Sequence, residues 1–172
     1  MNQLKTLKLP DYITLLGLLS VILSTLAAYF GYFLLAYFLI LGQIIADYFD
    51  GKLARKIKRQ NELGVHLDNF SDFYTIINDV LLGIFIGISH YAMFIIFPLF
   101  IAAGAVRLGY FTIRKNTEQN IYTGLPTTAC SFIISTLIIL NYLTNFAPMN
   151  YLLVFFLALA YLMVSNFKFQ KW

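Results

Sequence analysis

Charged residues are scarce in this chain of 172 residues, which holds 12 Lys and Arg and 8 Asp and Glu, or 12% of the sequence. A soluble domain carries about 25% charged residues, so the composition excludes an ordinary water-surrounded globular protein. By contrast, 60% of the residues are hydrophobic, which indicates that lipid surrounds most of the chain. The length suits a single helical membrane domain over residues 1–172 and leaves no room for a second domain.

Cysteine and histidine are also scarce. Cys130 is the lone cysteine and lies in an apolar segment, so no disulfide can form within the chain. Of the two histidines, only His66 lies near the acidic residues described below, which argues against a zinc site. No cleavable signal peptide is expected, because the first apolar run is followed by several more.

Apolar runs along the chain predict an all-α integral membrane protein with six transmembrane helices. The spans are expected at about 12–30, 32–46, 64–89, 92–112 and 126–140, with a sixth that ends near residue 165. A short head, residues 1–9, precedes them and mixes lysines with leucines. It is either an amphipathic segment on the membrane surface or a disordered basic leader.

The basic residues predict the orientation of these spans. All 12 Lys and Arg fall on the side that holds the head, two polar connectors and the tail, whereas the loops near Gly31, His90 and Asn145 have none. The positive-inside rule then places both termini and the connectors in the cytoplasm. The expected location is the plasma (inner) membrane of a prokaryote, with a polar site on its cytoplasmic side.

The acidic residues gather between the second and third predicted spans. Asp47 and Asp50 are three residues apart and Asp68 and Asp72 four apart, so each pair shares one face of a helix. Acids beside a bilayer are costly and repel one another, which indicates a site for divalent cations such as Mg²⁺, Mn²⁺ or Ca²⁺. The alternative is a pair of solvated helix ends with surface ion pairs.

The same stretch carries the pattern D-x-x-D-G-x-x-A-R, eight residues, then G-x-x-x-D-x-x-x-D. Its fixed positions are Asp47, Asp50, Gly51, Ala54, Arg55, Gly64, Asp68 and Asp72. This pattern resembles the signature of the CDP-alcohol phosphotransferases, and each position would match by chance at only about 5–10%. The resemblance implies an enzyme that transfers a phosphatidyl or archaetidyl group from a CDP-activated lipid to a small polar alcohol. CMP would be released in phospholipid biosynthesis.

The resemblance also implies roles for the motif residues. Asp47, Asp50, Asp68 and Asp72 would bind one or two Mg²⁺ or Mn²⁺ ions, and Asp72 would also be the catalytic base. Gly51 and Ala54 would be small because the cytidine lies against them, and Arg55 would contact the nucleotide phosphates. The nucleotide-binding set is thus Asp47, Asp50, Gly51, Ala54, Arg55, Gly64 and Asp68.

The implied partners are CDP-diacylglycerol or CDP-archaeol, the acceptor alcohol, membrane lipids and a second copy of the chain, but no nucleic acid. Gly83 and Gly87 form a small-xxx-small pair that is one candidate for a homodimer contact.

Segments outside the motif resemble phosphatidylserine and archaetidylserine synthases, which implies serine as the acceptor. The similar segments are D-x-x-T at 11–14, A-V-R-L-G-Y-F-T at 105–112 and G-L-P-T-T-A at 124–129. Tyr110, Thr112 and the stretch after Asp72 depart from those relatives. Glycerol 3-phosphate or an inositol phosphate is therefore an alternative acceptor, and a small cation-dependent membrane transporter is an alternative of another class.

Four residues are candidates for the acceptor or lipid-phosphate pocket: Thr75, Asp79, Arg107 and Arg114. A serine carboxylate would need a cation, for which Arg107 and Arg114 are candidates, and its ammonium would need Asp79. Alternatively, Asp79 pairs with Arg107, Arg107 extends to the membrane surface and Arg114 contacts lipid headgroups.

Overall fold

The computed structural model describes residues 7–57, 62–115, 121–165 and 168–170. Most of the predicted head, parts of both polar connectors and the end of the tail lie outside these ranges, and so do the side chains of Arg55 and Arg114. The six helices are α1 (Leu9–Tyr29), α2 (Phe33–Ile57), α3 (Glu62–Ile86), α4 (Met93–Lys115), α5 (Thr127–Thr144) and α6 (Leu152–Val164).

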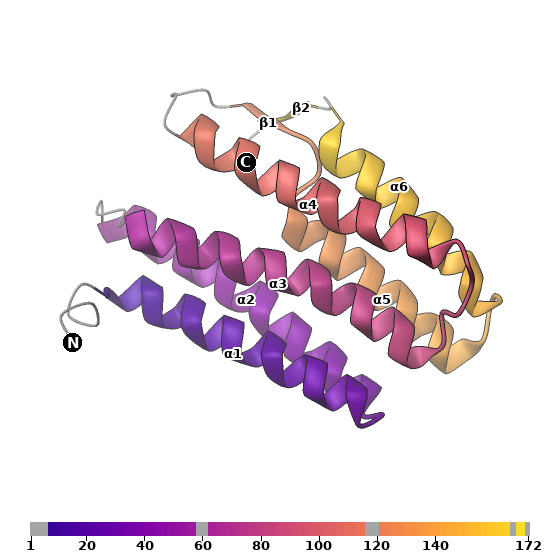
Figure 1. Cartoon of the computed structure of the whole chain (residues 1–172). Helices are drawn as coiled ribbons and strands as arrows, with labels where there is room; N and C mark the ends of the chain where they lie inside the picture. Colours follow the sequence, from indigo (N-terminus) through magenta and orange to yellow (C-terminus); the bar gives the residue numbers. More distant parts are fainter. Residues whose placement is uncertain (1–6, 58–61, 116–120, 166–167, 171–172) are drawn as a thin grey trace.

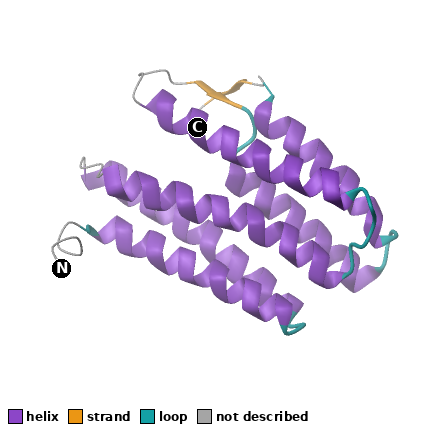
Figure 2. Ribbon diagram, viewed as in Figure 1, coloured by secondary structure: helices purple, strands orange, loops and turns teal. Residues whose placement is uncertain are grey.

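Helix α3 lies at the centre of the bundle. It packs against α1, α4 and α5, while α1 also packs against α2, and α4 against α6 (Figure 1). The helical secondary structure dominates the described chain (Figure 2). Because α3 is surrounded by other helices, its polar residues can lie inside the bundle rather than in lipid.

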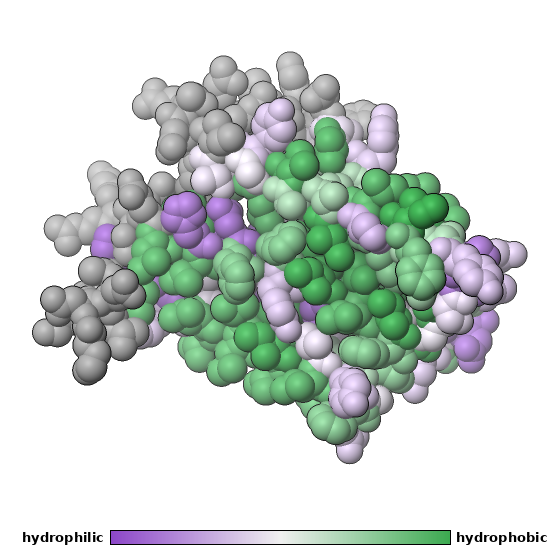
Figure 3. Space-filling view, in the orientation of Figure 1, coloured by the Kyte–Doolittle hydropathy of each residue, from purple (hydrophilic) through white to green (hydrophobic). Residues whose placement is uncertain are grey.

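Four helices are long and apolar enough to cross a membrane: Leu9–Tyr29, Phe33–Ala54, Met93–Thr112 and Thr127–Thr144. The prediction of six helices is confirmed, but α3 and α6 do not meet this criterion of length and composition. Helix α3 carries three aspartates, and α6 has only 13 residues, fewer than the roughly 20 that a span needs. Hydrophobic side chains cover most of the visible face, and hydrophilic ones gather toward its ends (Figure 3).

Helix α2 continues well beyond the predicted end of its span at residue 46 and includes the first part of the expected polar connector. Lys, Leu, Ala and Arg follow Gly51, and all four favour helix. Asp47 and Asp50 therefore lie within a regular helix, with fixed spacing between their side chains. At the other end of the bundle, α5 extends to Thr144 and ends at Asn145, whose φ of 50° is left-handed.

Two short strands accompany the helices, and the predicted all-α class holds. β1 (Ile121–Thr123) and β2 (Lys168–Gln170) pair antiparallel. Gly124 follows β1 with φ 78°, and a Cβ there would collide with the Met163 carbonyl. The next residue, Leu125, donates its N–H to the Leu162 carbonyl at 3.1 Å. This pairing joins segments far apart in the sequence, so no local periodicity predicts it.

Small residues bring α1 and α2 into close contact. A Cβ on Gly17 would lie 3.1 Å from the Ala46 Cβ. On the same interface, the Ser20 hydroxyl donates to the Leu39 carbonyl at 2.8 Å and the Ser24 hydroxyl to the Ala36 carbonyl at 2.9 Å. Close approach and hydrogen bonds between helices are what hold helices together in lipid.

Gly83 and Gly87, the candidates for a homodimer contact, each have a structural reason within the folded chain. A Cβ on Gly83 would lie 3.0 Å from Cδ1 of Ile88. Gly87 follows α3 with φ 128°, a conformation that suits glycine alone. Gly83 thus makes room for the Ile88 side chain, and Gly87 lets the chain leave the helix.

Candidate active site

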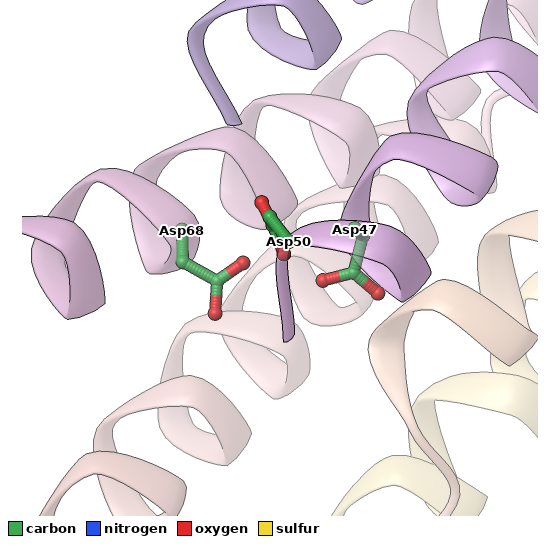
Figure 4. A group of neighbouring side chains, drawn as sticks. All are labelled: Asp47, Asp50 and Asp68. Carbon is green, nitrogen blue, oxygen red and sulfur yellow. The ribbon is translucent and has the colours of Figure 1, made fainter. Parts of the chain in front are cut away.

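Helices α2 and α3 bring three of the predicted aspartates together. One carboxylate oxygen from each of Asp47, Asp50 and Asp68 lies within 4.8 Å of the others (Figure 4). Asp50 is buried, and the other two are half-buried. Three like charges this close favour a cation between them, and carboxylate oxygens are the ligands that Mg²⁺ and Mn²⁺ prefer. The donor set therefore fits a divalent metal ion.

Helix α1 supports this cluster. Thr14 Oγ1 donates a hydrogen bond to Asp50 Oδ2. One turn earlier, the buried carboxylate of Asp11 accepts the Lys8 backbone N–H at 2.8 Å and caps the start of α1. In the sequence, D-x-x-T at 11–14 is only a point of resemblance, and it predicts no role for Thr14. Its role depends on the close packing of α1 on α2, which the local sequence does not show.

Replacement of Thr14 by valine should weaken the binding of Mn²⁺ by about tenfold, because hydrogen bonds that orient a ligand typically contribute 10–100-fold to metal affinity. The measurement is a Mn²⁺ titration of the purified protein in detergent. Thr14→Ser keeps the hydroxyl and should bind as the wild type does. Ser20→Ala removes a hydrogen bond of the same α1–α2 interface that does not involve the acids, so an equal loss in this control would assign the effect to helix packing.

The fourth aspartate, Asp72, lies outside the cluster of three. Its Oδ2 accepts a hydrogen bond of 2.9 Å from Thr127 Oγ1 at the start of α5. Its Oδ1 is buried and has no hydrogen-bond partner among the described residues. Asp50 and Asp68 are among the charged groups that act on it. One oxygen is thus held in place, while the other makes no hydrogen bond with the described residues.

Helix α2 leaves open space beside the acids. A Cβ added to Gly51 would meet no atom within 4 Å among the described residues. Packing against the described residues therefore does not require glycine here. Ala54 follows one turn later, so small residues line this face of α2.

Arg107 holds the turn that precedes α5. Its Nε donates to the Leu125 carbonyl, and its Nη2 donates to the Gly124 carbonyl at 3.4 Å. The guanidinium thus positions the segment that carries Thr127, and it also acts on Asp72. This differs from the alternative in which Arg107 extends to the membrane surface. The sequence does not predict this structural role, because the hydrogen-bond partners of Arg107 are backbone carbonyls.

The remaining acceptor candidates lie deeper in α3. Thr75 is buried, and its hydroxyl donates to the Ser71 carbonyl at 2.9 Å within the same helix. Asp79 is fully buried, and neither of its carboxylate oxygens has a hydrogen-bond partner in the described part of the chain. The alternative that pairs Asp79 with Arg107 is therefore not what the structure shows.

An apolar helical bundle with a carboxylate cluster near the ends of α2 and α3 defines a class: membrane proteins with a candidate site for a divalent cation. Comparison with known families is more specific. The CDP-alcohol phosphatidyltransferase family profile matches residues 7–165, and the chain belongs to this family. Together with the four apolar helices, this membership makes it an integral membrane protein.

The sequence identity to individual relatives is modest. The chain is 29% identical over 158 residues to the CDP-diacylglycerol–serine O-phosphatidyltransferase of Helicobacter pylori, which covers 81% of this chain and 64% of the relative. It is 28% identical over 167 residues to the archaetidylserine synthase of Methanothermobacter thermautotrophicus, with 95% and 70% covered. The chain thus spans less than two thirds of the length of the Helicobacter relative.

Proposed function

We propose that this protein transfers a phosphatidyl or archaetidyl group from a CDP-activated lipid to the hydroxyl of L-serine and releases CMP. The observation that carries the proposal is the arrangement of the acids, with Asp47, Asp50 and Asp68 within 4.8 Å of one another and Asp72 one turn further along α3. Family membership and the names of the two relatives, both of which concern serine, support the reaction and the acceptor.

In the proposed reaction, the serine hydroxyl oxygen forms a bond to the lipid-bearing phosphorus of the donor. The bond between that phosphorus and the bridging oxygen breaks, and CMP leaves with the electron pair. Asp72 takes the proton of the attacking hydroxyl at its Oδ1, while the Thr127 hydroxyl fixes Oδ2. Such positioning of a general base typically contributes 10²–10⁴-fold to the rate.

Asp47, Asp50 and Asp68 would hold a divalent ion, Mg²⁺ or Mn²⁺, whose charge would offset that of the donor phosphates. Asp72 as a ligand of a second ion is also part of the proposal. Gly51 and Ala54 leave the face of α2 open for the cytidine, and Arg55 and Gly64 complete the nucleotide-binding set by their place in the motif.

The arrangement in the membrane is also a proposal. We place both termini and the acidic cluster on the cytoplasmic side of a prokaryotic plasma membrane, because the 12 basic residues lie on that side of the predicted topology. All six helices would cross the bilayer, with α3 and α6 shielded by their neighbours. The chain would act as one domain and as a homodimer.

The test is the release of CMP by the purified protein from CDP-diacylglycerol or CDP-archaeol in the presence of Mn²⁺ or Mg²⁺. We expect turnover with serine and none after the metal is removed with a chelator. Turnover with glycerol 3-phosphate or an inositol phosphate but not serine would keep the chemistry and overturn the acceptor. A protein that binds no CDP-lipid and releases no CMP would favour a transporter instead.

A further inference from the structure

We infer that Asp79 and Ser131 form the binding site for the ammonium group of the acceptor, deep between α3 and α5. The inference rests on the proposed function and adds how the protein would recognise an amino alcohol. Its starting point is that Asp79 and Ser131 are two buried polar side chains without a hydrogen-bond partner in the described residues.

The Asp79 carboxylate faces the start of α5. It lies close enough to act on Cys130 and to interact with the Ser131 hydroxyl, but among the described residues neither its oxygens nor that hydroxyl makes a hydrogen bond of normal geometry. Buried polar groups in proteins are nearly always hydrogen-bonded, and each exception calls for an explanation. A bound ligand that donates hydrogen bonds to the Asp79 carboxylate and the Ser131 hydroxyl would explain this exception.

The chemistry of the pair favours an ammonium over a metal ion. A primary ammonium has three N–H donors and no acceptor, which suits a carboxylate and a hydroxyl oxygen together. Mg²⁺ and Ca²⁺ need about six or more oxygen ligands, and this pair offers few. An ionised carboxylate inside the bundle is costly without a cation, so the bound ammonium would offset that cost.

The position of Asp79 also fits a small acceptor. It follows Asp72 by seven residues, or two turns of helix, which separates their Cα atoms by about 10 Å. In the proposed binding mode, the acceptor lies along this face of α3 with its hydroxyl at Asp72 and its ammonium at Asp79. The two groups are connected by α5, because Thr127 contacts Asp72 and Ser131 lies one turn further.

Two adjacent polar residues interrupt the apolar part of α3. The chain has Asn78 and Asp79 where the apolar part of α3 would otherwise continue. Asn78 bonds to α1, donating to Ser24 Oγ at 3.1 Å and accepting from Thr25 Oγ1 at 2.7 Å. The structure thus uses Asn78 to join two helices and leaves Asp79 turned toward α5.

Steady-state kinetics with matched acceptors test the inference. We expect Asp79→Asn to raise the KM for serine by about 30-fold or more, since loss of one partner of a buried charge pair costs at least that factor. The KM for CDP-diacylglycerol should stay unchanged. The wild type should strongly prefer serine to 3-hydroxypropanoate, which lacks the ammonium, and Asp79→Asn should lose that preference. Ser131→Ala should raise the serine KM about three- to tenfold.

Ser135→Ala is the matched control for Ser131→Ala. Ser135 lies one turn further on the same face of α5, and its hydroxyl donates to the Ser131 carbonyl at 2.6 Å within its own helix. Its removal should leave the serine KM unchanged. If Asp79→Asn does not fold, Ser131→Ala alone decides, and an unchanged serine KM then overturns the inference.

Other outcomes separate this inference from the proposed function. Normal use of serine by a folded Asp79→Asn protein would overturn the ammonium site and leave the proposed function intact. A wild type that releases CMP only with an acceptor that has no ammonium would overturn both the serine assignment and this site. Fewer bound Mn²⁺ ions in Asp79→Asn than in the wild type would show a metal site in place of an ammonium site.

Discussion

Replacement of Asp50 by asparagine should reduce CMP release by about 10³-fold or more at a fixed Mn²⁺ concentration. Asp50 is the buried member of the group of three carboxylates, and Thr14 holds its side chain. The amide keeps the size of the side chain but removes the charge that holds the ion. A bound metal contributes several kcal/mol to such reactions, and about 1.4 kcal/mol corresponds to a factor of ten in rate.

A Mn²⁺ titration of the Asp50→Asn protein measures the expected loss of metal affinity directly. We expect affinity to fall by more than about 100-fold, beyond the 10–100-fold effect of changes in outer hydrogen bonds. Asp68→Asn should behave in the same way, because both residues contribute to the group. Asp79→Asn is the matched control, since it removes a buried carboxylate from α3 outside the group and should leave Mn²⁺ binding intact. Unchanged Mn²⁺ binding in Asp50→Asn would place the metal elsewhere.

Replacement of Asp72 by asparagine should lower kcat by about 10²–10⁴-fold, the contribution of a positioned general base. Thr127 can still donate to the amide oxygen of the asparagine, so the side chain keeps its place. Because Asp72 lies outside the group of three, the binding of CDP-diacylglycerol and of one Mn²⁺ ion should persist. The measurements are single-turnover release of CMP and, separately, titrations of lipid and metal.

Thr127→Val provides a graded comparison, because it removes only the hydrogen bond that orients Asp72 and should lower kcat by about tenfold. A kcat for Asp72→Asn within threefold of the wild type would contradict the role of base. If Asp72→Asn loses one of two bound Mn²⁺ ions, Asp72 is also a ligand, as the family resemblance implies.

The sequence by itself determined the membrane environment, the six helices and the acidic motif. Composition predicts lipid as the solvent, because so little charge cannot cover a water-exposed surface. Spacings of three and four place Asp47 with Asp50, and Asp68 with Asp72, on single helix faces. These are local properties of the chain, so periodicity is enough to predict them.

Only the tertiary structure decided which of these residues meet. It grouped Asp68 with Asp47 and Asp50 but bonded Asp72 to Thr127. It also placed Arg107 on the turn before α5 and left Asp79 without a partner in the described residues. These contacts join different elements of the chain, and the order of residues along one helix does not specify its rotation against its neighbours. The close packing of small residues and buried hydrogen bonds fixes that rotation, and through it the chemistry of the site.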